Sequence, residues 1–563
     1  MENLNDFYIN KLLPYQVPHV YQLYESFGQS SCVLDASDTG TGKTYTTIAL
    51  CGLLNLKPFV ICPKSVINSW INVAKEFNIE MRGISNYEKM QGCKYYTPSY
   101  EIANCPYVDK YLIAPKNKQN DNKSKNDKPI ESKKKKKDKY GFIFQLPHDT
   151  IVIIDEAHRC KNHKTINSTM LQAFRDSKTK ILLLSATITD KIDCFKPFGV
   201  VFGLYDNVKK YNMWIRNKLK IKKIMIEHMK KKNKNKNNDN HHDDEYLTDG
   251  EIQTQIIHNA IFPKMGCRMK IKELGDLFPQ NQVIAKCYYS EDHASVDKLY
   301  ILINDALEDL KKKEMKSVAL GQIVRCRMRI EMYKLPIMLD LVDDALNEGY
   351  SVAIFVNFKD SMNYLAHHLS EECSLIHGDQ TLEDRDYNIE NFQTNKTKVI
   401  ISIIQAGGVG ISLHDLYGRP RISLISPSWS GTDVVQALGR IHRAKSKSPA
   451  LQRIIYIAES YEEEICKKLT GKLTVLSGIN DGDLVGPRLN IEKLKEDGHL
   501  DIINQNVTNL QNINNNDNNN TIKKANFVKV ESNEETAFEK KPEIQVGEFK
   551  GSTKGVPDKY LPM

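Results

Sequence analysis

The chain reads Ser37-Asp38-Thr39-Gly40-Thr41-Gly42-Lys43-Thr44 between a short apolar run and a longer apolar segment. This order predicts a strand, a glycine-rich loop and a helix. Glycines let backbone N–H groups wrap a phosphate chain without Cβ clashes, and a helix N-terminus adds a favourable dipole. We therefore expect the loop to bind a nucleotide through Asp38, Thr39, Gly40, Thr41, Gly42, Lys43 and Thr44. A structural glycine turn without a ligand is the other interpretation.

Two residues of this loop have specific predicted roles. Lys43 would reach the β- and γ-phosphates, and Thr44 would ligate Mg²⁺. Ser37 stands where the general pattern of such loops has its first glycine, which is a departure from the strict motif.

A second apolar run, residues 151–154, ends in the acidic pair Asp155 and Glu156. Such a pair after a strand often caps a helix. With a phosphate loop upstream, it indicates a metal site and a base instead. Asp155 would hold Mg²⁺ through its waters, and Glu156 would orient or deprotonate an attacking water.

Short β-rich runs alternate with amphipathic segments in two stretches, a pattern typical of parallel sheets flanked by helices. Unbroken Ile/Val/Leu runs fit strands that are buried on both faces. The predicted fold class is therefore α/β. The expected strands are residues 32–36, 59–62, 151–155 and 181–185 in the first stretch, and 352–357, 374–377, 399–403, 422–426 and 454–458 in the second. The expected domains are a first lobe at 1–205, a helical and basic connecting region at 206–335, a second lobe at 336–480 and a largely disordered tail at 481–563.

Composition excludes several classes of protein. The chain has 563 residues, of which 40% are hydrophobic, and no apolar run approaches the ~18 residues of a membrane span. The N-terminus lacks a basic n-region. The 12 cysteines lie far apart without a CxxC, so we expect reduced thiols inside the cell.

Positive charge is concentrated in two segments. Residues 115–139 carry a net charge of +7 and residues 206–240 a net charge of +9, so the remaining chain is acidic although the total is +9. The first segment is predicted to be a solvated Lys-rich insertion, or else a nuclear-targeting or polyanion-binding tract. The second is predicted to be a basic helix followed by a flexible insertion. Asparagine dominates residues 504–520, which predicts a disordered tail.

Three motifs stand in a fixed order along the two predicted lobes: Asp155-Glu156-Ala157-His158, Ser185-Ala186-Thr187 and Gln436-Ala437-Leu438-Gly439-Arg440-Ile441-His442-Arg443. Together they resemble the motifs of superfamily-2 helicases with a DEAH-type acidic box, over roughly residues 10–480. The resemblance implies two RecA-like lobes with ATP in the cleft between them. The first lobe would supply the phosphate loop and the Mg²⁺ ligand.

The resemblance also implies roles for residues of the second lobe. Arg440 and Arg443 match the positions of arginine fingers that touch the γ-phosphate. Gln436 would lie beside these arginines and contact the γ-phosphate or a water. Phosphoryl transfer needs positive charge on developing oxyanions, which agrees with this assignment. Gln16 resembles the family's adenine-reading glutamine, although a plain helix start fits the same segment.

The nucleic-acid strand would be held through its backbone, because the family's strand-binding motifs match Lys64, Ser65, Gly378, Gly407 and Gly408. The helix after Lys64 continues to Trp70, which we interpret as a core residue. Trp429 would pack against the second lobe, or else stack on a base.

The second lobe is similar to Swi/Snf-like, strawberry-notch-like and large-DNA-virus helicases. Ser185-Ala186-Thr187 and Ala444-Lys445-Ser446 depart from the Swi/Snf pattern. The predicted function is an ATP-dependent helicase or translocase on nucleic acid, with DNA favoured and RNA possible, in viral or cellular transcription or replication. Its cofactors would be ATP and Mg²⁺. Its location would be intracellular, in the cytoplasm, the nucleus, or a viral particle or factory.

One alternative is a duplex-DNA translocase that does not unwind. Another is a clamp or scaffold that binds ATP without hydrolysing it, which is disfavoured because Glu156 and the two arginines are present. A nuclease or restriction subunit with a fused motor is also disfavoured, because the tail has no clustered-carboxylate nuclease motif.

Overall fold

The computed structural model describes residues 2–113, 139–234, 247–275, 278–290, 292–312, 316–369, 372–407, 411–458 and 460–481, and short strands at 490–491, 493–494 and 500–501. The Lys-rich insertion and the Asn-rich tail predicted from the sequence lie largely outside these residues. Residues 504–563 form a separate unit of the chain, also outside the described residues.

The first lobe is built on a sheet of eight described strands in the order β10-β1-β9-β8-β2-β3-β4-β5. Its strands are β1 (Cys32–Asp35), β2 (Lys57–Cys62), β3 (Gly83–Asn86), β4 (Lys94–Tyr96), β5 (Ile102–Asn104), β8 (Thr150–Asp155), β9 (Lys180–Leu184) and β10 (Gly266–Cys267). Leu184 is in register with Asp35 on one side and with Asp155 on the other. The carboxyl ends of β1 and β8 therefore lie at the same edge of the sheet.

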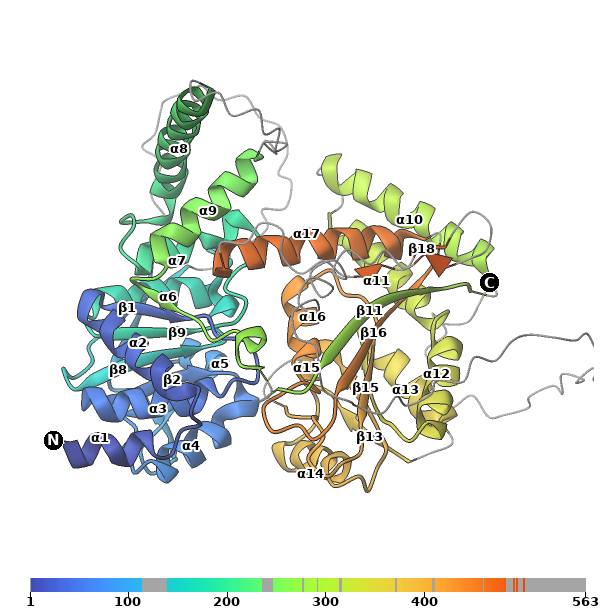
Figure 1. Ribbon diagram of the computed structural model, residues 1–563, viewed down its shortest axis with the longest axis horizontal. Coiled ribbons are helices and arrows are strands. Elements are labelled where there is room, and N and C mark those ends of the chain that lie inside the picture. Colours follow the sequence, from blue (N-terminus) through green and yellow to red (C-terminus); the bar gives the residue numbers. More distant parts are fainter. Residues whose placement is uncertain are drawn as a thin grey trace, which may run out of the picture. The chain divides into compact units, whose positions relative to one another are not determined.

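Helices cover both faces of this sheet (Figure 1). The helices of this lobe are α1 (Glu2–Ile9), α2 (Gln16–Gln29), α3 (Lys43–Leu54), α4 (Ile67–Glu76), α5 (Tyr87–Gln91), α6 (Ile166–Asp176), α7 (Lys196–Val201), α8 (Tyr211–Lys234) and α9 (Asp249–Ile261), of which α8 packs against α9 and extends away from the sheet (Figure 1). The strands β6 (Val108–Leu112) and β7 (Tyr140–Phe144) form a small ribbon. Successive strand residues join different cores: Val33 packs in one apolar cluster and Leu34 in the other. Burial on both faces explains why these strands are continuous apolar runs.

The second lobe contains a sheet of seven described strands in the order β13-β14-β12-β15-β16-β11-β17. They are β11 (Asn281–Tyr288), β12 (Ser351–Val356), β13 (Cys373–Ile376), β14 (Val399–Ile403), β15 (Arg421–Ile425), β16 (Ala450–Ile457) and β17 (Asn490–Ile491). The helices are α10 (His293–Lys312), α11 (Lys316–Met332), α12 (Leu335–Asn347), α13 (Lys359–His368), α14 (Leu382–Gln393), α15 (Ile404–Gly407), α16 (Gly431–Leu438) and α17 (Tyr461–Asp481). A last hairpin pairs β18 (Lys493–Leu494) with β19 (Leu500–Asp501).

Each strand expected from the sequence is present, with small shifts at its ends, and α8 matches the predicted basic helix. Both sheets also take a strand from the region 206–335, which the pattern predicted only as a helical connection. β10 has two residues, and β11 begins with two exposed polar residues and is fully buried at Ala285 and Cys287 alone, so it forms no continuous apolar run. Neither carries the signal of a strand that is buried on both faces.

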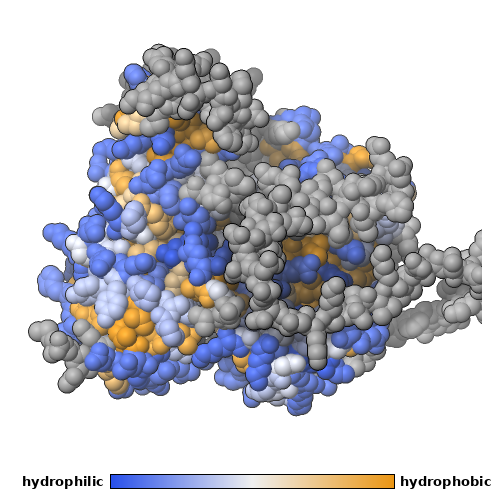
Figure 2. Space-filling model, in the orientation of Figure 1, coloured by the Kyte–Doolittle hydropathy of each residue, from blue (hydrophilic) through white to orange (hydrophobic). Residues whose placement is uncertain are grey.

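Hydrophilic residues cover most of the coloured part of the face in Figure 2, with apolar residues gathered in patches between them. Among the described residues, no helix combines the length and the apolar composition needed to cross a membrane.

Candidate functional site

The loop after β1 has the geometry of a phosphate cradle. Gly40 and Gly42 lie in the left-handed region with φ of 90° and 87°, and Gly42 directly precedes α3. A Cβ on Gly40 would lie 2.9 Å from Cγ of Arg443, and one on Gly42 would lie 2.2 Å from Nε2 of Gln16. Glycine is therefore required at both positions by conformation and by space. The loop backbone can approach a ligand closely.

Lys43 opens α3, and its ammonium group turns back over the loop. Its Nζ donates hydrogen bonds to the carbonyl oxygens of Ser37 at 2.9 Å and Asp38 at 3.1 Å. Thr41 closes the same loop with a hydrogen bond from Oγ1 to the Asp38 carbonyl at 2.8 Å. The half-buried Thr44 is the next residue of the helix. This places the predicted phosphate ligand and the predicted metal ligand side by side.

The side chain of Asp38 is used by the protein itself. Its Oδ1 accepts a hydrogen bond from Nη2 of Arg268 at 2.7 Å, and its Oδ2 accepts one from the backbone N–H of Ile271 at 2.9 Å. The carboxylate thus attaches the phosphate loop to the segment that contains Arg268 and Ile271. Any contact between Asp38 and a nucleotide would therefore involve the backbone of Asp38.

Gln16 is buried, and both ends of its amide have protein partners. Oε1 accepts from the N–H of Leu13 and Nε2 donates to the carbonyl oxygen of Thr41, each at 2.9 Å. The hydroxyl of Tyr15 donates to the same carbonyl at 3.2 Å. The start of α2 is therefore locked onto the phosphate loop, and adenine recognition by Gln16 stays a prediction.

Asp155 ends β8 and is held by an indole. Its Oδ2 accepts a hydrogen bond from Nε1 of the fully buried Trp70, and its Oδ1 accepts one from the N–H of Glu156, both at 2.9 Å. Burial and the neighbouring charge of Glu156 raise the pKa of Asp155 above its usual value. Trp70 is thus both a core residue, as expected, and a positioning residue for Asp155. Its contact with Asp155 depends on the pairing of distant strands, so no local signal predicted it.

Glu156 follows in the left-handed region with φ of 54°, which is uncommon for a residue with a Cβ and is typical of functional sites. Its Oε2 lies 3.2 Å from Nδ1 of His158 and accepts a hydrogen bond from Nε2 of Gln436 at 3.1 Å. Burial alone would raise the pKa of Glu156, but the hydrogen bond and the charge of His158 outweigh it and hold this pKa below its usual value. Glu156 is therefore ionised and available as a hydrogen-bond acceptor.

The two predicted arginine fingers share one acceptor. The carbonyl oxygen of Ile411 accepts from Nη1 of Arg440 at 3.2 Å and from Nη2 of Arg443 at 2.7 Å. Burial lowers the pKa of Arg440 to about 10 and, with the charge of Arg440, lowers that of Arg443 to about 9. Both side chains are thus charged at neutral pH, and Cγ of Arg443 lies against Gly40.

These contacts join the lobes along a line that we call the seam. It consists of the Gly40–Arg443 approach, the Glu156–Gln436 hydrogen bond and a hydrogen bond of 3.2 Å from Nζ of Lys161 to Oγ1 of Thr432. Thr39 also belongs to it, because a Cβ on Gly439 would lie 1.9 Å from its Oγ1. The structure therefore brings together the phosphate loop, the acidic pair and Arg443, which the sequence places on separate lobes.

The residues expected to bind nucleic acid lie after the carboxyl ends of strands. Lys64 and Ser65 form a turn after β2, and Lys64 is exposed. Gly378 is exposed after β13, and Gly407 ends the short α15 after β14. Gly408 lies outside the described residues. Their roles stay predictions.

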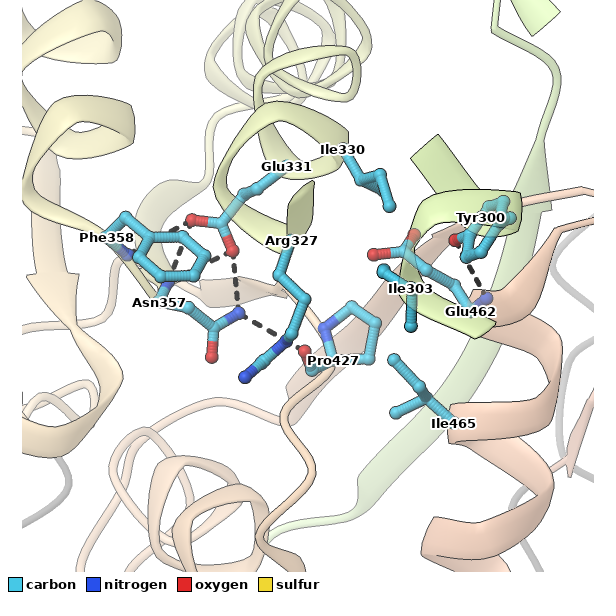
Figure 3. Close-up of a pocket in the computed structure, with 10 residues that line it drawn as sticks. All are labelled: Tyr300, Ile303, Arg327, Ile330, Glu331, Asn357, Phe358, Pro427, Glu462 and Ile465. Carbon is cyan, nitrogen blue, oxygen red and sulfur yellow. Dashed lines mark hydrogen bonds between the residues drawn. The ribbon is translucent and has the colours of Figure 1, made fainter. Parts of the chain in front are cut away.

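A small pocket of the second lobe has apolar and polar walls, and Glu331 is one of its polar residues (Figure 3). The carboxylate of Glu331 accepts hydrogen bonds from the backbone N–H and the Nδ2 of Asn357, at 2.9 and 2.6 Å, and from Oγ of Ser426 at 2.7 Å. It therefore fixes the loops after β12 and β15.

The guanidinium of Arg327 stands over two rings beside this pocket. Its Cζ lies 5.8 Å from the centre of Phe358 and 5.0 Å from the centre of Trp429. Cation–π contacts of this kind stabilise a packed arrangement. Since Arg327 covers one face of Trp429, the packing role of this ring is favoured over stacking on a base.

Two protein-family models match the chain. Residues 9–190 match the family described as the type III restriction enzyme, res subunit, and residues 333–445 match the helicase conserved C-terminal domain. The first range contains the phosphate loop and the acidic pair. The second contains Gln436, Arg440 and Arg443.

Known proteins are similar to this chain over both lobes. A protein of Acanthamoeba polyphaga mimivirus, named "Putative ATP-dependent RNA helicase", is 34% identical over 492 residues, which is 86% of each protein. The ISWI chromatin-remodeling complex ATPase of Saccharomyces cerevisiae is 21% identical over 521 residues, 83% of this chain and 40% of that protein. The solved structure of S. cerevisiae Dbp5 bound to RNA and ADP BeF3 covers 82% of this chain and 92% of that chain, with 13% identity and a TM-score of 0.41.

Proposed function

The chain belongs to the superfamily-2 helicases, enzymes that hydrolyse ATP to act on nucleic acid, and we propose that it cleaves ATP at the seam. The hydrogen bond of 3.1 Å between Glu156 and Gln436 carries this proposal, because it joins the base of one lobe to the motif that bears the fingers of the other. Arg440 and Arg443 stand on that same motif.

The residues present fit ATP with Mg²⁺. Gly40 and Gly42 adopt positive φ and carry no Cβ, so the N–H groups of the loop backbone are of the kind that binds phosphate oxygens. Nζ of Lys43 donates hydrogen bonds to two carbonyl oxygens of the loop, and it can donate to phosphate oxygens instead. Thr44 and Asp155 would hold Mg²⁺, since hydroxyl and carboxylate oxygens are the ligands it prefers. The bound metal would neutralise charge on the phosphates.

Each catalytic residue has a distinct task. Glu156, ionised and fixed by His158, orients the attacking water and accepts its proton. Lys43 neutralises the phosphate chain, and Arg440 and Arg443 place positive charge where the oxyanion develops. Trp70 holds Asp155 in the orientation that it needs as a ligand. Cleavage would thus depend on both lobes at once.

The nucleic acid would be bound through its phosphate backbone, with DNA favoured over RNA. This preference is tested by the ATP turnover of the full chain with duplex DNA, single-stranded DNA and RNA of equal length, together with a strand-separation assay. Stimulation by duplex DNA without strand separation would favour a translocase, and stimulation by RNA alone would overturn the preference for DNA. Backbone binding predicts an affinity that falls steeply with salt.

The substitution Glu156→Gln tests the site itself. The amide keeps the shape of the side chain but cannot accept a proton, so we expect ATP turnover to fall at least ~100-fold while ATP still binds. Binding would be measured with a fluorescent ATP analogue, and Glu88→Gln, an exposed glutamate of α5, is the matched control. Unchanged turnover in Glu156→Gln would contradict the assignment of the base.

A further inference from the structure

Helix α17 is anchored at its start in the second lobe. Glu462 forms a buried ion pair of 2.6 Å with Lys334 and accepts a hydrogen bond from the N–H of Ile457 at 3.0 Å. Leu469 and Leu473, further along the helix, belong to the apolar core of the same lobe. This part of α17 therefore moves with the second lobe.

The last turn of α17 contacts the first lobe instead (Figure 1). Ile479 is fully buried in the core of the first lobe, and its carbonyl oxygen lies 3.0 Å from Nδ1 of His258. Nδ2 of Asn480 donates a hydrogen bond of 2.7 Å to the carbonyl oxygen of Ala186, inside Ser185-Ala186-Thr187. One helix thus spans both lobes and ends beside a helicase motif.

The final residue of the helix, Asp481, reaches the phosphate loop through one guanidinium. Its Oδ1 lies 3.2 Å from Nε of Arg268 and 3.4 Å from Nζ of Lys270. Nη2 of Arg268 donates to Oδ1 of Asp38, in the phosphate loop, at 2.7 Å. The Asp481–Arg268–Asp38 chain is mostly screened from water, with exposed fractions of 13%, 16% and 26%. Nε of Arg268 and Oδ1 of Asp481 form an ion pair without hydrogen-bond geometry, and charge pairs that are screened from water are worth more than exposed ones.

The segment that carries Arg268 is attached firmly to the loop. β10 ends one residue before it and pairs with β1. The N–H of Asp38 donates to the carbonyl oxygen of Met269 at 3.0 Å, and the N–H of Met269 donates to Oγ of Ser37 at 2.9 Å. A shift of Arg268 is therefore transmitted to the loop.

We propose that Arg268 is a positioning residue of the ATP site, which holds the phosphate loop through Asp38 and is itself set by Asp481 at the end of α17. The docking of α17 on the first lobe then tunes ATP binding. A planar guanidinium presents separate N–H groups to the two carboxylates in a fixed geometry, which the flexible ammonium of a lysine does not reproduce. This inference rests on the proposed binding of ATP at the seam.

The test is a double-mutant cycle on the full chain, with the dissociation constant of a fluorescent ATP analogue as the readout. We expect Asp481→Asn to weaken binding about 5-fold, the size of one partly buried charge contact, and Arg268→Ala to weaken it more. In the Arg268→Ala background, Asp481→Asn should have no further effect. Glu273→Gln is the control, because Glu273 contacts Lys270 and has no ion pair with Arg268.

Arg268→Lys supplies a second background, to be used if the alanine variant does not fold. There, too, the effect of Asp481→Asn should shrink. An effect of Asp481→Asn that is equal in every background, or no effect at all, would overturn the inference. Failure of the unsubstituted chain to bind ATP would instead overturn the proposed function, so the two failures are distinguishable.

Discussion

The two sides of the seam differ in the partners that hold their side chains. In the first lobe, Lys43 is held by carbonyls of its own loop, and Asp155 by Trp70 of the same lobe. In the second lobe, Arg440 and Arg443 share the carbonyl oxygen of Ile411, whereas Gln436 donates its hydrogen bond to Glu156 across the seam. The phosphate loop is therefore organised by its own lobe, whereas the pair of Glu156 and Gln436 depends on the contact between lobes. We expect substitutions in the phosphate loop to change ATP binding, and substitutions of Glu156 and of the second-lobe arginines to change turnover.

The largest expected effect belongs to the first lobe. Lys43→Ala removes the ammonium group that faces the phosphates, so we expect ATP turnover to be abolished and ATP binding to weaken sharply, while most nucleic-acid affinity stays. Turnover, ATP binding and nucleic-acid binding would be measured on the same preparation. Lys57→Ala, at a lysine paired with Glu80 at the amino end of β2, is the control. Unchanged turnover in Lys43→Ala would refute the phosphate-loop assignment.

The next effect belongs to the second lobe. Arg443→Ala should lower turnover ~10³-fold, as expected for an arginine finger, with little change in the dissociation constant of ATP. Arg443→Lys should recover only part of the rate, because an ammonium group cannot make the same contacts. The exposed Lys447 provides the control Lys447→Ala. Loss of ATP binding in Arg443→Ala would contradict the expectation that the phosphate loop determines ATP binding and the arginines determine turnover.

The smallest effect tests how the first lobe holds its metal ligand. Trp70→Phe keeps the packing but removes the N–H that binds Asp155, and losing such a partner typically costs ~10-fold in metal affinity. We therefore expect a higher Mg²⁺ concentration for half-maximal ATP turnover. Trp429→Phe in the second lobe should leave this concentration unchanged. An equal shift in both variants would point to a general loss of stability instead.

Some residues at the seam could be predicted because their motifs are contiguous. The phosphate loop and the acidic pair each follow an apolar strand, and both lie at strand ends as expected. The contacts of Trp70 and Arg268 could not be predicted from the sequence in this way. Trp70 touches a residue 85 positions away, and Arg268 touches one 230 positions away. Such contacts depend on the order of strands in a sheet.

The sequence by itself determined the α/β class, the buried strands and the glycine loop, because local periodicity and backbone freedom are properties of neighbouring residues. Only the tertiary structure decided that β10 and β11 join the two sheets, that Ile411 offers one carbonyl to two arginines, and that Asp481 reaches Asp38 through Arg268. These arrangements require segments far apart in the chain to be packed together. The free energy of that packing comes from burial of apolar residues in the cores of the two lobes. No single stretch of residues encodes these cores, because their residues come from distant parts of the chain.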